Sequence, residues 1–104
     1  MRMLVFFDLP TVKAIDRRNY NRFRKFLIKE GFIMVQESVY CKLVLNHSIM
    51  NSVKKRVEKN APQKGLVQLL CVTEKQYASI EYITGSKINK KVIDSMERLI
   101  VIWL

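Results

Sequence analysis

The stretch MLVFFDL (Met3–Leu9), closed by Pro10, decides the fold of this 104-residue chain. A short run rich in Val and Phe that ends at a proline predicts a β-strand. Its side chains alternate between two apolar faces, with Met3, Val5 and Phe7 on one and Leu4 and Phe6 on the other. A strand that is apolar on both sides needs cover on both faces of its sheet.

The residues after this strand predict a helix, a hairpin and a second helix. Spacing typical of an amphipathic helix runs from Lys13 to Glu30 and stops at Gly31. Two strands follow, Phe32–Gln36 and Val39–Leu45, joined by a tight turn near Glu37 and Ser38. Asn46 then caps a helix that extends to about Asn60.

The last part of the chain predicts further short elements. Leu66–Val72 reads as a nearly continuous apolar strand, and Thr73 opens a capping box for a short helix to about Ser79. Ile80–Thr84 predicts a strand that ends at Gly85. Ser86–Glu97 predicts a loop or helical turn, and Arg98–Trp103 a late strand.

This β-α-β-β-α-β order predicts an α+β, ferredoxin-like antiparallel sandwich with an extra C-terminal strand. The chain fits one domain, 1–104, with a core over 1–85 and a C-terminal extension over 86–104. Two helices would cover one sheet face. Because the strands are apolar on both sides, we expect a homodimer that joins the other sheet faces.

The charge of the chain indicates a polyanionic partner. Nineteen Lys and Arg against nine Asp and Glu give a net charge of +10, and such a field attracts nucleic acid by counterion release. Two other interpretations of this charge are that it only keeps the protein soluble, or that it binds an anionic membrane surface.

No signal segment or apolar run of transmembrane length is present in the sequence, so we expect a soluble cytoplasmic protein. Cys41 and Cys71 lie in apolar stretches and are expected to be reduced core thiols.

The basic residues gather on the first predicted helix. Between positions 17 and 29 the sequence has no acidic residue. Like charges at i, i+4 spacing are mildly destabilising, so a bound polyanion explains the pattern better than a solvated face. Arg side chains also match phosphate oxygens, which favours contacts to a nucleic-acid backbone. The candidates for these contacts are Arg17, Arg18, Arg22, Lys25 and Lys29.

Asp8 is the one carboxylate in the first strand. An unpaired buried carboxylate is costly, so Asp8 should be solvated, engaged in a cap, or bound to a metal. As a cap it would serve the following loop or helix. As a ligand it would suit Mg²⁺, which proteins commonly hold with one or two carboxylates plus water and substrate phosphate. A two-fold dimer would bring a second Asp8 to the same place.

Three segments together resemble a known family. They are Arg2–Pro10, the pair Arg17 and Arg18, and the run Gly31–Tyr40, which contains Gln36-Glu37-Ser38-Val39-Tyr40. In order and spacing they resemble the CRISPR-associated endonucleases that partner the CRISPR integrase in spacer acquisition, in the form found in type II systems. The resemblance covers essentially the whole chain.

The resemblance implies a ferredoxin-like homodimer, and it implies that Asp8, Arg17, Arg18 and Tyr40 are functional residues. Asp8 corresponds to a strand-end aspartate at the two-fold axis, a proposed Mg²⁺ ligand for phosphodiester hydrolysis. Arg17 and Arg18 correspond to basic residues that contact phosphate, and Tyr40 to an aromatic position at which Phe is more usual. Met34 stands where many relatives carry Arg, so a nuclease here would lack that cation.

Three functions follow as alternatives. In the first, the dimer is a scaffold that binds duplex DNA between two integrase dimers and sets the length of the captured DNA. In the second, it is a Mg²⁺-dependent endonuclease acting on RNA or DNA, with Asp8 as catalytic residue and metal ligand. In the third, it is a ferredoxin-like toxin nuclease or small regulatory domain unrelated to CRISPR.

Overall fold

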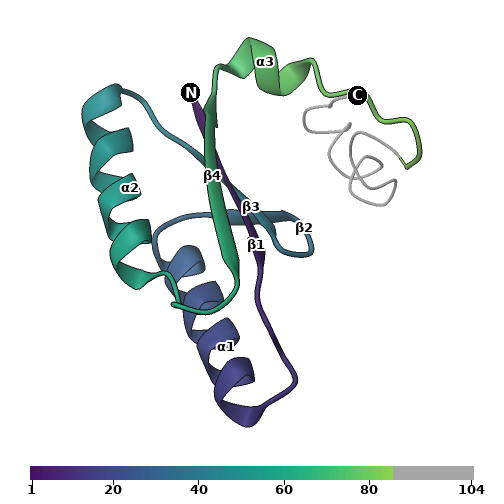
Figure 1. Cartoon of the computed structure of the whole chain (residues 1–104). Helices are drawn as coiled ribbons and strands as arrows, with labels where there is room; N and C mark the ends of the chain where they lie inside the picture. The colour runs from purple at the N-terminus through teal and green to yellow at the C-terminus, as the bar shows by residue number, and fades with distance from the viewer. Residues whose placement is uncertain (86–104) are drawn as a thin grey trace.

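A computed structural model describes residues 1–85 of the chain. Within them four strands and three helices follow one another in the order β1 (Arg2–Asp8), α1 (Ala14–Lys29), β2 (Ile33–Gln36), β3 (Val39–Leu43), α2 (His47–Asn60), β4 (Leu66–Val72) and α3 (Glu74–Ala78). The strands form one antiparallel sheet in the order β2-β3-β1-β4, with β1 in its interior. This is the predicted ferredoxin-like arrangement, and α1 and α2 lie on the same side of the sheet (Figure 1).

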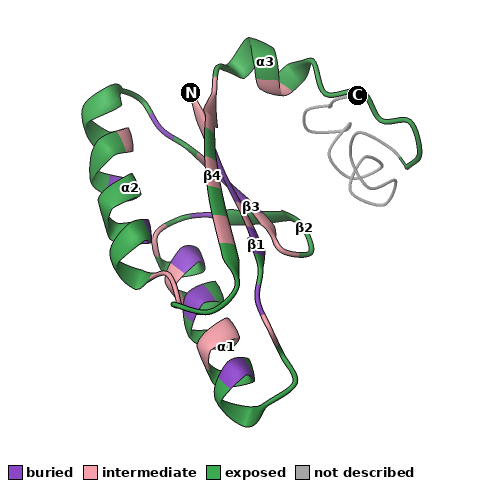
Figure 2. Ribbon diagram, in the orientation of Figure 1, coloured by how far each residue is buried: buried purple, intermediate pink, exposed green. Residues whose placement is uncertain are grey.

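The core lies between this pair of helices and one face of the sheet. Met3, Val5 and Phe7 of β1 are buried, and they meet buried apolar residues of both helices. Phe7 is the centre of an aromatic cluster, with ring centroids 5.4 Å from Phe23 and 5.5 Å from Tyr40. Figure 2 shows the buried positions on β1 and on the inner sides of α1 and α2. The alternation predicted for the first strand therefore places its Met3–Phe7 side in the core.

The opposite face of the sheet is apolar and largely open among residues 1–85. The register aligns Ile33, Cys41, Leu4 and Leu70 in one row across all four strands. The inner two, Leu4 and Cys41, are buried, whereas Ile33 is 70% and Leu70 50% exposed. Asp8, which pairs with Leu66 at the end of the β1–β4 ladder, lies on the same face, because it is four residues from Leu4 along β1. We call this surface the open sheet face.

Helix α3 is held to the start of β1 by Arg2. The Arg2 guanidinium donates from Nε to both carboxylate oxygens of Glu74, at 2.9 and 3.1 Å. It also lies over the Tyr77 ring, 4.5 Å from the centroid, an arrangement that is attractive for a cation. The hydrogen bond to Glu74 raises the pKa of Arg2, so the guanidinium stays charged in this contact. The predicted capping box is present, since Thr73 accepts a bond from the Gln76 amide at 3.1 Å.

Most predicted elements are confirmed to within two residues, but one is wrong. Residues 80–85 form no strand, although Ile80–Thr84 has a strand-like pattern. Strand β4 is the last strand of the described sheet, and a segment without a neighbouring strand cannot form a ladder. Ile83 is accordingly 89% exposed. The predicted loop over Ser86–Glu97 and the strand over Arg98–Trp103 lie outside the described residues.

Candidate nucleic-acid interface

Asp8 is an exposed carboxylate at the last position of β1. Within residues 1–85 its carboxylate takes part in no ion pair or side-chain hydrogen bond, so the cap interpretation finds no support. The cap at the start of α1 comes instead from Asp16, whose Oδ2 accepts a long bond of 3.4 Å from the Lys13 amide. Asp8 is therefore held in place by the β1–β4 ladder, with its side chain available to a ligand.

One copy of the chain supplies a single carboxylate to this position. In the described part of the chain no three His, Cys, Asp or Glu side chains come together as a metal site. A hard cation here would therefore need water, substrate phosphate or a second copy of Asp8 as its other ligands. The carboxylate oxygen is a donor of the type that Mg²⁺ prefers. One chain supplies only one such carboxylate, and a dimer would supply two.

Four basic residues of α1 form a continuous exposed stripe, which we call the α1 ridge. At 100° per residue they lie on one narrow face of the helix, opposite the buried Asp16, Phe23 and Leu27. No acidic side chain of residues 1–85 forms an ion pair with them; nearby Glu30 is bonded to Arg56 instead, at 2.8 Å. The ridge consists of Arg18, Arg22, Lys25 and Lys29.

Arg17 lies outside the ridge and has a different environment. Its guanidinium donates to the backbone carbonyls of Thr11 and Val12, at 3.1 and 2.7 Å. These bonds tie α1 to the turn that follows Asp8, so part of the donor capacity of Arg17 is used within the chain. Sequence reasoning grouped Arg17 with the other basic residues because spacing alone does not reveal such a contact.

Tyr40 does not belong to this surface. Its side chain is only 1% exposed, and its ring stacks on Phe7 in the core. A ring buried between the sheet and α1 cannot contact nucleic acid in this fold, so the prediction of a binding role for Tyr40 does not fit the structure. Its position on β3, opposite Val5 of β1, explains the burial.

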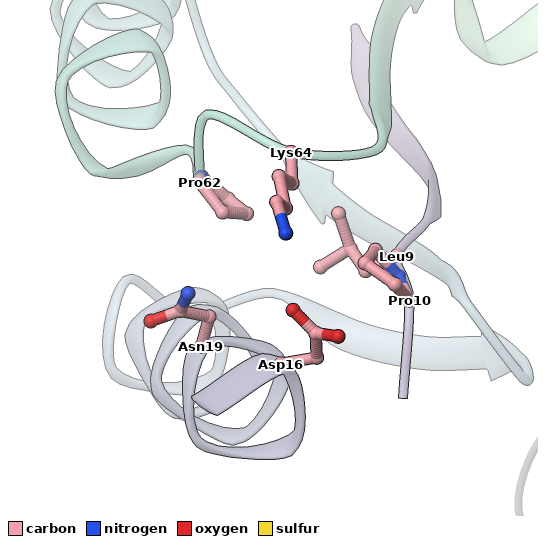
Figure 3. A pocket seen from close by; sticks show the side chains of 6 residues that line it. All are labelled: Leu9, Pro10, Asp16, Asn19, Pro62 and Lys64. Carbon is pink, nitrogen blue, oxygen red and sulfur yellow. The ribbon is translucent and has the colours of Figure 1, made fainter. Parts of the chain in front are cut away.

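Sequence reasoning missed two groups beside the turn after Asp8. Lys64 and the buried Asp16 point into a small recess that is also lined by Leu9 and Pro10 (Figure 3). The adjacent Gly65 lies directly against Asp8, since a Cβ on Gly65 would be 2.7 Å from the Asp8 carbonyl oxygen. Pro62 and Gly65 are residue types typical of a turn, but they do not indicate what the turn contacts.

The described helices include none that is long and apolar enough to cross a membrane.

Comparisons with known proteins all lead to one family. Residues 1–80 match the family model described as CRISPR associated protein Cas2. A protein named CRISPR-associated endoribonuclease Cas2 from Treponema denticola is 53% identical over 102 residues, which is 98% of this chain and 100% of that protein. One of the same name from Streptococcus mutans is 47% identical over 96% of this chain and 91% of that protein.

A solved structure supports the fold. The crystal structure of Streptococcus pyogenes Cas2 at pH 6.5 superposes with a TM-score of 0.61, covering 81% of this chain and 100% of that one. The sequence identity is 16%, so this likeness bears on the fold alone.

Proposed function

This chain belongs to the CRISPR-associated Cas2 family, and on that premise we propose that it is a homodimeric scaffold of the spacer-acquisition complex. In this role it binds duplex DNA together with the CRISPR integrase in the cytoplasm. The observation that carries the proposal is the α1 ridge, whose four cations are exposed and take part in no ion pair within residues 1–85.

The dimensions of the ridge suit a DNA backbone. From Arg18 to Lys29 the helix rises about 16 Å, and successive phosphates of one strand follow at about 3.4 Å along a duplex axis. The ridge therefore covers the axial length of roughly five base-pair steps. Contacts of this kind position a duplex without reading its sequence. A scaffold that captures fragments of any sequence requires this type of binding.

A dimer through the open sheet face is supported by the apolar character of that face. Ile33, Leu43 and Leu70 are each at least half exposed in a single chain, and burying such side chains contributes about 25 cal/mol per Å². Because Asp8 lies on the same face, a two-fold axis there would bring two Asp8 carboxylates toward each other. The dimer would also double the number of ridges available to one DNA molecule.

The scaffold proposal is tested with the double variant Arg18→Glu/Lys25→Glu. We expect its affinity for duplex DNA to fall by at least about tenfold. The slope of log K against log salt concentration, where K is the association constant for duplex DNA, should become shallower by about 2. Each lost phosphate contact reduces this slope by about 0.9. Spacer acquisition in cells should be abolished. The control is Lys55→Glu/Lys75→Glu, which makes the same change in net charge on α2 and α3.

Two outcomes would contradict the proposal. If the ridge variant and the control weaken DNA binding equally, only net charge matters and the ridge is not the binding surface. If the ridge variant supports spacer acquisition at the parental rate, DNA binding by α1 is not part of that process.

A second candidate function is a Mg²⁺-dependent endonuclease, favoured by the exposed Asp8 carboxylate at the strand end. The relatives from Treponema denticola and Streptococcus mutans are named endoribonucleases. In this role Asp8 would hold the cation, which would stabilise the charge on the scissile phosphate. A nuclease acting independently of the CRISPR integrase would use the same residue.

The nuclease is tested with Asp8→Asn, which removes the charge but keeps the shape of the side chain. Mg²⁺-dependent cleavage of RNA should fall roughly 100-fold or more, with the melting temperature unchanged because Asp8 is exposed. Asp8→Asn that cleaves at the parental rate would assign the activity to a contaminant. Spacer acquisition by this variant, measured in parallel, separates the scaffold from the nuclease.

A further inference from the structure

An open cleft of ≈ 510 Å³ lies between the first half of α1 and the C-terminal end of α2. The connection after α2, residues 61–64, forms its third wall. The recess that holds Asp16 and Lys64 adjoins it and shares four of its lining residues, among them Asn19 and Pro62 (Figure 3). The cleft shares Arg22 with the α1 ridge, but its other lining residues belong neither to the ridge nor to the open sheet face.

Three cations from three different segments converge on the cleft. Arg22 comes from α1, Lys59 from the last turn of α2, and Lys64 from the connection to β4. The only acidic residue in the lining is Asp16, which is 6% exposed. Cations that follow one another along a single helix often only form its solvent-exposed face. Cations that tertiary structure brings together from different segments create a local positive field. The field favours an anion such as a phosphate group.

The other polar groups of the cleft are side-chain amides. Asn19, Asn60 and Gln63 line it, and an amide both donates and accepts hydrogen bonds. Asn60 is oriented by its own bond, since Nδ2 donates to the Arg56 carbonyl at 2.8 Å. Its Oδ1 is thereby left as an acceptor. Groups of this kind match the mixed donors and acceptors on the edge of a nucleobase.

The remaining walls are apolar. Ile15 and Pro62 contribute apolar surface against which a flat ring can pack, whereas Phe23, also in the lining, is only 1% exposed. The Asp16 carboxylate points into the adjoining recess (Figure 3), whose volume of ≈ 10 Å³ admits no more than about one water molecule. The volume of the cleft falls within the range of about 300–1,000 Å³ that is usual for small-molecule sites. It is far too small for a base pair with its two backbones.

We propose that this cleft binds one nucleoside monophosphate unit, with the phosphate on Arg22, Lys59 and Lys64 and the base among the amides. The unit is either a free mononucleotide or an unpaired nucleotide of a strand, because a base within a duplex has its faces covered by its neighbours. The site goes beyond the proposed scaffold function and does not depend on it, since a free nucleotide would bind whether or not α1 binds duplex DNA.

The test is a titration of the ¹⁵N-labelled full-length chain with AMP, CMP, GMP and UMP, followed by NMR. We expect saturable shifts of the side-chain amide signals of Asn19, Asn60 and Gln63. Inorganic phosphate, as a probe of the anion alone, should bind at least about tenfold more weakly. The absence of saturable shifts at millimolar nucleotide would overturn the proposal. Equal binding of phosphate and nucleotide would also overturn it, because the base would then make no contribution.

A short single strand and a blunt duplex of equal length distinguish the two sources of the nucleotide. If oligo(dT) binds the cleft at least about tenfold more tightly than free thymidine monophosphate, the natural ligand is an unpaired nucleotide of a strand. If the two bind equally, the ligand is a free mononucleotide. If the blunt duplex shifts the same amide signals as strongly as the single strand does, the cleft does not select an unpaired base and the proposal fails.

A matched pair of variants tests the phosphate contacts. Lys59→Ala/Lys64→Ala should weaken nucleotide binding at least about tenfold. Lys54→Ala/Lys55→Ala removes the same charge from another part of α2 and should leave binding within about twofold. All four lysines are exposed, and circular dichroism checks that both variants fold. Equal losses in the two variants would show that general charge, rather than the cleft, attracts the nucleotide.

Discussion

At the scale of single residues, the structure depends on a close approach between Gly65 and the end of β1. Gly65 has φ +93°, and a Cβ there would lie 2.7 Å from the Asp8 carbonyl oxygen and 2.8 Å from Leu9 Cδ2. Glycine is required both for the left-handed backbone and for the space. Through this contact the connection after α2 sets the position of Asp8, and therefore of any ligand that Asp8 binds.

Gly65→Ala should lower the free energy of unfolding by about 1–3 kcal/mol, because the methyl group meets backbone that cannot move away. The measurement is urea unfolding followed by circular dichroism. Gly31→Ala is the comparison, since Gly31 has φ +99° but its Cβ would meet only the flexible end of Lys42, at 2.8 Å. Gly31→Ala should cost less. If the two variants lose equal stability, backbone conformation rather than the contact with Asp8 determines the cost at Gly65.

At the scale of elements, helix ends are determined by local hydrogen bonds that the sequence encodes directly. Asn46 caps α2, with its Oδ1 accepting a 2.8 Å bond from the Ile49 amide. Glu30, which follows the last residue of α1, is joined to Arg56 of α2 by two bonds of 2.8 and 3.0 Å. The Glu30–Arg56 ion pair connects the two helices that border the cleft.

Asn46→Ala should destabilise the protein by about 1 kcal/mol, because the Ile49 amide loses its partner at the start of α2. Asn46→Asp keeps an acceptor at the cap and should retain nearly all of the stability. Thermal unfolding of both variants checks the expectation. If the aspartate variant is as unstable as the alanine variant, the bond to Ile49 is not what stabilises this end of α2.

At the scale of the whole molecule, the open sheet face and the net charge of +10 act in opposite directions on self-association. Apolar residues on the face favour pairing, whereas two strongly basic chains repel each other. Leu70 lies in the row that crosses all four strands and is 50% exposed. It is therefore a suitable place to test the proposed dimer.

Leu70→Glu should convert a dimer into a folded monomer, because a charge within an apolar interface would be buried without a partner. Light scattering at micromolar concentration measures the change. Val12→Glu is the control, since Val12 is 86% exposed in the turn before α1 and should leave the dimer intact. A monomeric parent protein under the same conditions would contradict the dimer itself.

Much of the fold follows from the sequence because it rests on local patterns. Alternation in Met3–Phe7 predicted a strand apolar on both faces, the i, i+4 spacing of Arg18 and Arg22 predicted an exposed stripe, and Asn46 predicted a helix start. Each of these signals depends only on residues close together in the chain. The same patterns predicted a strand at Ile80–Thr84, where the described structure has none, because a strand also needs a neighbour that local sequence does not specify.

The sequence by itself therefore determined the order of the elements, the face of α1 that stays solvated, and the carboxylate at the end of β1. Only the tertiary structure decided that Tyr40 is core rather than surface, that Arg17 bonds to its own turn, and that Arg22, Lys59 and Lys64 line one cleft. The physical reason is that periodicity sets which side of an element a residue faces. What lies on that side depends on how distant elements pack, which no local pattern contains.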